Sequence, residues 1–161
     1  MIDKKPPSIL LYGFGNPGRQ DDGLGVALVD ELERLAIPNC SFEQNYQLNA
    51  EDALLISKFD IVIFVDASLR VENYSITPLT PALEIGFTTH AMNPASVVAL
   101  CKELYGVLPQ CYLFELHGCE WEMHEGISIE GQKIFKDALA FIIPILQSYN
   151  VHDLIKKHVV T

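Results

Sequence analysis

Short apolar runs recur along the chain, and residues typical of turns separate them. Residues 60–66 are β-branched and apolar throughout their middle, and residues 8–13 form an apolar run that ends in glycine. Runs of this length without polar alternation predict strands that are covered on both faces, as in a parallel sheet. The expected strands are residues 8–13, 40–47, 60–66, 74–79 and 110–116, with 74–79 at an edge because prolines limit its pairing.

Helical patterns fill the stretches between these runs. Leucines recur at helical spacing from residue 24 to residue 35, which predicts an amphipathic helix that ends before Pro38. Asn49, Asn93 and Ser128 are good N-cap residues ahead of three further patterns, and Pro94 suits a first helical position. The expected helices after the first are residues 50–58, 94 to about 105, and 129 to about 149.

The alternation of strands and helices predicts the fold class. It is typical of a three-layer α/β/α sandwich, doubly wound around a mostly parallel sheet of about five strands. The 161 residues are the usual size of one domain, so we expect residues 1–161 to form a single domain. In such sheets, functional sites lie beyond the C-terminal ends of the strands.

A loop rich in glycine and aspartate follows the first expected strand. It spans residues 13–25, and Asp21 and Asp22 lie just ahead of the first helix, where the helix dipole and free N–H groups favour a carboxylate. Two adjacent aspartates allow a split role, in which one caps the helix and the other points into a cleft. A phosphate-binding loop is the weaker interpretation, because the GK[ST] ending of a P-loop is missing.

Two more polar residues follow expected elements. Asp66 ends an apolar strand, and His90 lies in the loop ahead of the helix that begins at Pro94. Asp66 alone is explained equally well as a loop residue that accepts N–H bonds, and a lone loop histidine is ordinarily structural or exposed. Together, Asp22, Asp66 and His90 would offer two oxygen donors and one imidazole, a set that suits a divalent transition metal with positions left open.

Other catalytic signatures give no competing site. Residues 117–124 contain two histidines and two glutamates without a recognised ligand spacing, so we interpret this stretch as a structural loop. The sequence has no G-x-S-x-G motif for a serine nucleophile and no H-E-x-x-H motif for a zinc peptidase.

Charge and composition narrow the range of partners. The formal net charge of −10 repels phosphate backbones, so we expect no nucleic-acid partner. The polar start and the short first apolar run suit neither a signal peptide nor a membrane span, so we expect a cytoplasmic protein with no membrane partner. The four cysteines contain no CxxC pair, and we expect free, largely buried thiols.

Three blocks of the sequence resemble the hydrogenase maturation proteases. The first is the glycine loop with Asn16 and its Asp-Asp-Gly-Leu-Gly end; the second is Val-Asp-Ala at residues 65–67, closing a strand; the third is Thr89-His90, followed by a proline-capped helix. The blocks stand in the family's order and spacing, and the resemblance runs from about Ser8 to the last helix. It implies an α/β/α sandwich and an endopeptidase that removes the C-terminal extension of a nickel–iron hydrogenase large-subunit precursor.

The resemblance also implies roles for individual residues. The family's metal-contacting and catalytic trio falls on Asp22, Asp66 and His90. The first position is often glutamate in the family, which leaves Asp21 as the alternative to Asp22; we assign Asp22 because the loop aligns without a gap. The resemblance implies that the nickel is carried by the substrate, so we expect no resident cofactor, although such a site would hold nickel, zinc or cadmium in vitro. We expect a monomer whose partner is the large-subunit precursor.

Two other functions remain open at this point. Residues 13–18 also resemble the loop of peptidyl-tRNA hydrolases, but residues 19–25 lack the histidine that follows it in that family, and an enzyme that grips tRNA should be basic. A non-catalytic module that binds a metal or a nucleotide is the alternative of a different class.

Overall fold

The computed structural model describes residues 5–84, 92–148 and 150–158. Its centre is a five-stranded sheet with the order β2-β1-β3-β5-β4. The strands are β1 (Ile9–Phe14), β2 (Cys40–Asn45), β3 (Ile61–Ser68), β4 (Tyr74–Leu79) and β5 (Gln110–His117). Strand β4 is antiparallel to β5, and the other pairs are parallel. The predicted mostly parallel sheet, with residues 74–79 at one edge, is confirmed.

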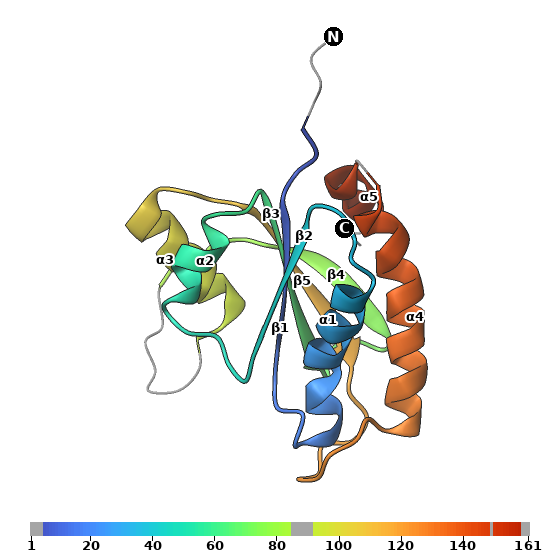
Figure 1. Cartoon of the computed structure of the whole chain (residues 1–161). Coiled ribbons are helices and arrows are strands. Elements are labelled where there is room, and N and C mark those ends of the chain that lie inside the picture. The colour runs from blue at the N-terminus through green and yellow to red at the C-terminus, as the bar shows by residue number, and fades with distance from the viewer. Residues whose placement is uncertain (1–4, 85–91, 149, 159–161) are drawn as a thin grey trace.

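Helices cover both faces of this sheet, which gives the three-layer sandwich that the sequence predicts (Figure 1). One face carries α1 (Leu24–Arg34), α4 (Ile129–Leu146) and α5 (Val151–His158). The other face carries α2 (Asp52–Ile56) and α3 (Pro94–Tyr105). A 3₁₀ turn, η1 (Gln20–Gly23), leads into α1.

The apolar residues of the central strands divide between two cores. In β1 and β3, Leu11 and Ile63 face α1 and α4, whereas Leu10 and Val62 face α2 and α3, and all four are buried. Successive side chains of a strand point to opposite faces, so a strand that is apolar at every position needs helices on both sides. No helix in the described ranges is long and apolar enough to cross a membrane.

Two of the three predicted N-caps, Asn93 and Ser128, are confirmed. Asn93 accepts a hydrogen bond from the Ser96 amide at 2.8 Å, and the Ser128 hydroxyl accepts one from the Gly131 amide at 3.0 Å. The prediction that Asn49 caps the second helix is wrong. The helix begins at Asp52, and the Asp52 carboxylate accepts a hydrogen bond from the Asn49 amide at 2.8 Å. A capping Asn49 would instead accept a hydrogen bond through its side chain.

The C-terminal region differs from the sequence prediction. Helix α4 ends at Leu146, shortly after Pro144, and a separate helix α5 follows. Val151 and Ile155 of α5 are buried in the core shared with α1 and α4. The predicted single helix to about residue 149 is therefore too long, because the chain turns and packs its last apolar side chains back onto the sheet.

Candidate functional site

The carboxyl ends of the central parallel strands meet at one edge of the sheet. Gly13 of β1 is in register with Val65 of β3, so the glycine loop after β1 and Asp66 near the end of β3 lie at the same edge. Asp22 lies in η1, which is part of that loop. The structure thus brings Asp22 and Asp66 together at the position expected for a site in a doubly wound fold.

Glycines make this close approach possible. A Cβ atom on Gly15, whose φ is +139°, would lie 2.1 Å from the carbonyl oxygen of Asp22. A Cβ atom on Gly25 would lie 2.3 Å from the carbonyl oxygen of Val65, so the start of α1 rests directly on the end of β3. Only residues without a side chain allow the loop and the helix to bring Asp22 next to Asp66.

Asp22 and Asp66 influence each other electrostatically. The Asp22 carboxylate accepts a hydrogen bond from the Asn16 amide at 3.0 Å and remains half-buried. Burial first, and the nearby Asp22 charge second, raise the pKa of Asp66 to about 7. Two carboxylates that repel each other in a partly dry site favour either a proton or a bound cation.

Asp21 has a different role from its neighbour. It is fully buried and accepts four hydrogen bonds from the segment that joins β5 to α4. The donors are the amides of Cys119 (2.8 Å), Glu120 (3.1 Å) and Ser128 (2.8 Å) and the hydroxyl of Ser128 (2.6 Å). Burial raises the pKa of Asp21, but these hydrogen bonds outweigh it and the net pKa is lowered. The prediction that one of the two aspartates caps the first helix is wrong, because neither η1 nor α1 has a side-chain hydrogen bond at its N-cap.

The loop after β5 is fastened to the glycine loop by further contacts. The Gln20 side chain donates to Glu120 at 3.0 Å and accepts from the Glu122 amide at 2.9 Å. Arg19 donates through Nε to the carbonyl oxygen of Trp121 at 3.0 Å, and its guanidinium lies 5.6 Å from the centre of the indole ring. The loop with the two histidines thus acts as a support for η1, which agrees with its structural interpretation.

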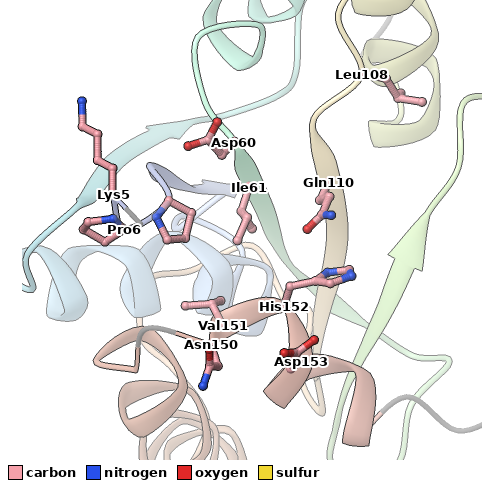
Figure 2. A pocket seen from close by; sticks show the side chains of 11 residues that line it. Lys5, Pro6, Asp60, Ile61, Leu108, Gln110, Asn150, Val151, His152 and Asp153 are labelled. Atoms are coloured by element: carbon pink, nitrogen blue, oxygen red, sulfur yellow. The ribbon is translucent and has the colours of Figure 1, made fainter. Parts of the chain in front are cut away.

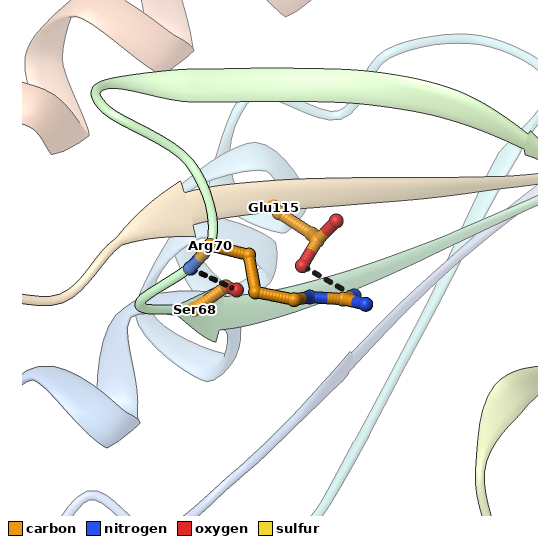
Figure 3. A network of polar contacts seen from close by, with 3 residues as sticks. All are labelled: Ser68, Arg70 and Glu115. Atoms are coloured by element: carbon orange, nitrogen blue, oxygen red, sulfur yellow. Dashed lines mark hydrogen bonds and ion pairs between the residues drawn. The ribbon is translucent and has the colours of Figure 1, made fainter.

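A second acidic residue lies beside Asp66. Glu115 of β5 is in register with Asp66 and is buried, with only 7% of its surface exposed. Arg70 donates from Nη2 to Glu115 Oε2 at 2.9 Å, and the Arg70 amide donates to the Ser68 hydroxyl at 3.0 Å (Figure 3). Sequence reasoning missed this group. Its available signal was a single acidic residue inside the apolar strand of residues 110–116.

His90 lies outside the described residues, so its position stays a prediction. The nearest described residue after it, Met92, forms a bridge with Leu48, which follows β2. Because β2 runs parallel to β1, Leu48 lies toward the edge that holds Asp22. Among the described residues, no group of three or more His, Cys, Asp or Glu side chains is arranged to hold a metal ion.

Exposed apolar side chains surround this edge. Tyr46 follows β2, Leu69 follows β3 and Met123 follows β5, and they are 62%, 71% and 75% exposed. Two shallow pockets of about 360 and 190 Å³ flank the start of α1, and both are lined by Pro17 and Val26. Exposed apolar side chains on the loops beside a polar centre suit a surface that binds another macromolecule.

A larger pocket lies at the opposite edge of the sheet. It measures about 510 Å³ and is lined at the starts of β3 and β5 by Ile61 and Gln110, and in α5 by Val151 and His152 (Figure 2). The nitrogen Nδ1 of His152 contacts the hydroxyl of Tyr112. Since the C-terminal ends of the parallel strands are remote from it, this pocket does not belong to the carboxylate site.

Comparisons with known proteins give the fold a family context. No family model matches the sequence, and no curated protein matches it. Among solved structures, the hydrogenase maturating endopeptidase HybD from E. coli matches with a TM-score of 0.67 and 21% identity, over 86% of this chain and 91% of that chain. The nickel–iron hydrogenase maturation protease HycI from Thermococcus kodakarensis matches with a TM-score of 0.66 and 23% identity, over 93% and 94%.

A third structure, a hydrogenase 2 maturation peptidase from a Thaumarchaeota archaeon, matches with a TM-score of 0.62 and 19% identity, over 86% of this chain and 97% of that chain. These matches cover 86–93% of this chain and 91–97% of the other chains. The chain therefore has the fold of the hydrogenase maturation proteases, the same family that its sequence blocks resemble.

Proposed function

We propose that this protein is an endopeptidase that removes the C-terminal extension of a nickel–iron hydrogenase large-subunit precursor after nickel insertion. The observation that carries the proposal is the pairing of Asp22 with Asp66 at the open edge of this fold. In this proposal His90 completes the group that contacts the nickel. The similar solved structures are described as maturation proteases of this kind, which supports the proposal.

The electrostatics of the carboxylate pair support recognition of a cation. Burial and the charge of Asp22 disfavour the ionised form of Asp66, and a divalent ion placed between the two would remove that repulsion. A peptidase that contacts a nickel ion held by its substrate would gain affinity from this relief. Cleavage would then depend on the metal having been inserted, so the enzyme would act as a checkpoint in assembly.

The surroundings of the pair support a protein as the substrate. Tyr46, Leu69 and Met123 expose large apolar surfaces on three separate loops around the same edge. A small-molecule site would instead be expected to enclose its ligand in a deep pocket. The acidity of the chain and of this edge also disfavours the peptidyl-tRNA hydrolase alternative, because phosphate groups would be repelled.

We further propose that the nickel belongs to the substrate and that the enzyme carries no metal of its own. Structural metal sites usually have four Cys or His ligands, whereas two aspartates and one histidine leave coordination positions free. By the affinity trend of first-row metals such a set accepts nickel and also zinc. The free positions would suit an ion whose other ligands come from a second protein.

The experiment compares two incubations and reads the precursor on a denaturing gel. Chelator-treated enzyme with nickel-loaded precursor should give the shortened product. Metal-supplemented enzyme with nickel-free precursor should leave the precursor intact. The opposite result would make the protein a metallopeptidase with its own ion, and no cleavage in either tube by a folded enzyme would refute the peptidase proposal.

A further inference from the structure

Arg70 is an exposed cation held in place at the edge that carries the carboxylate pair. Its side chain is 75% exposed, yet its guanidinium is bonded at 2.9 Å to Glu115, whose side chain is only 9% exposed. Its backbone is fixed as well, because the Arg70 amide donates to the Ser68 hydroxyl at 3.0 Å (Figure 3). Since Glu115 is the register neighbour of Asp66, the guanidinium lies next to the proposed reaction centre.

A purely structural role would be that Arg70 neutralises the buried Glu115. That role leaves unexplained why an acid stands there, since an apolar residue would suit the end of strand β5 and would avoid a second carboxylate beside Asp66. The arrangement uses a buried carboxylate to hold one end of an exposed guanidinium. In the part of the chain that the structure describes, the guanidinium bonds Glu115 through Nη2, and its other N–H groups can donate to a molecule that covers the edge.

The chemistry of peptide hydrolysis creates a need for such a group. When water adds to a peptide carbonyl, negative charge develops on the carbonyl oxygen. Asp22, Asp66 and Glu115 would repel this charge. A fixed guanidinium beside them can donate hydrogen bonds to the oxygen and stabilise the charge. The same acids would repel a substrate carboxylate, so the neutral carbonyl is the favoured acceptor in the ground state.

We propose that Arg70, held by Glu115, donates a hydrogen bond to the carbonyl oxygen of the peptide bond that is cut; this inference rests on the proposed function. Water forms the new C–O bond, and the carbonyl oxygen carries the negative charge facing Arg70. When the C–N bond breaks, that oxygen becomes part of the new carboxylate. Both protons of the attacking water end on the nitrogen of the released chain, which leaves as an ammonium group.

The test uses three variants of the full chain and the nickel-loaded precursor. R70A removes the donor. R70A alone also leaves the buried Glu115 carboxylate without its partner, which can destabilise the fold. The double variant R70A/E115Q removes that carboxylate charge as well, so a loss of activity in it is not caused by an unpaired buried charge. R34A is the matched control, because Arg34 is 76% exposed and pairs with Glu31 at 3.6 Å on α1, away from the sheet edge.

We expect R70A and the double variant to lose on the order of 10²–10³-fold in kcat with little change in KM, as for removal of a donor to a developing oxyanion. The double variant should melt near the wild-type temperature, and R34A should process normally. Wild-type kcat in the double variant would overturn the inference, as would a loss confined to KM. If the wild-type enzyme itself leaves the precursor uncut, the proposed function fails instead.

Discussion

Replacing Asp21 with alanine should destabilise the protein far more than replacing its neighbour Asp22. Asp21 is fully buried, and its removal leaves three backbone amides, those of Cys119, Glu120 and Ser128, without their acceptor. A buried donor left unsatisfied costs about 1–3 kcal/mol. With partial relaxation of the loop, we expect the free energy of unfolding to fall by about 3–5 kcal/mol.

Asp22 provides a matched control on the next residue. Its carboxylate accepts one hydrogen bond, from the Asn16 amide, and it is only half-buried. Removing it also relieves repulsion with Asp66, so Asp22→Ala should change stability by about 1 kcal/mol or less. Equilibrium unfolding in urea at neutral pH measures both variants. Equal losses for the two variants, or a loss of only about 1 kcal/mol for Asp21→Ala as expected for a simple helix cap, would refute this reasoning.

The pH dependence of stability gives a second test of how Asp21 stabilises the fold. Because the pKa of Asp21 is lowered in the folded state, its ionised form stabilises the fold above the unfolded pKa of about 3.9. That contribution is lost as the pH falls through the lower, folded-state pKa. The stability difference between wild type and Asp21→Ala should therefore be largest near neutral pH and shrink in acid. A difference that grows in acid would show that the carboxylate is not bound as its ionised form.

Three further predictions concern variants of the proposed site residues and of Gly25, which lets α1 pack against β3. Asp22→Ala, Asp66→Ala and His90→Ala should each abolish processing of nickel-loaded precursor on a gel while circular dichroism shows a retained fold; normal processing by any of them would remove that residue from the proposed site. In urea titrations at about pH 8, Asp66→Asn should be more stable than wild type, because the fold disfavours the ionised form of Asp66, whose pKa is raised to about 7. This gain in stability should vanish toward about pH 4, where the Asp66 carboxyl is protonated in the folded protein. Gly25→Ala should cost about 1–3 kcal/mol or more in thermal unfolding, since its methyl group would press on the carbonyl oxygen of Val65; an unchanged melting temperature would contradict that contact.

The sequence alone predicts the elements that depend on local patterns. Strand β4 and helix α3 have the bounds that the sequence predicts, because Pro78 marks an edge strand and Asn93-Pro94 marks a helix start. Helix α5 was missed, because its side chains are buried by a turn after Pro144 that returns the chain to the sheet. A helical pattern shows which side chains need a core, but it does not show where the chain reverses.

The candidate site also has a part that local patterns predict and a part that depends on residues far apart in the sequence. The placement of Asp22 and Asp66 at one edge follows from the positions of their strands, which local pattern and the geometry of parallel sheets both give. The anchoring of Asp21 depends on Ser128, 107 residues away, and the fixing of Arg70 depends on Glu115, 45 residues away. Partners at such separations leave no local pattern, so single-sequence reasoning had no means to pair them.

The short turn η1 explains how two adjacent aspartates take opposite roles. A 3₁₀ turn has about three residues per turn, so successive side chains point about 120° apart. Asp21 is thereby directed to the loop between β5 and α4, and Asp22 to the end of β3. The bonds made by Asp21 hold the turn against the repulsion that Asp22 and Asp66 exert on each other. A buried aspartate therefore secures the backbone that keeps Asp22 and Asp66 next to each other, which the proposed contact with a cation requires.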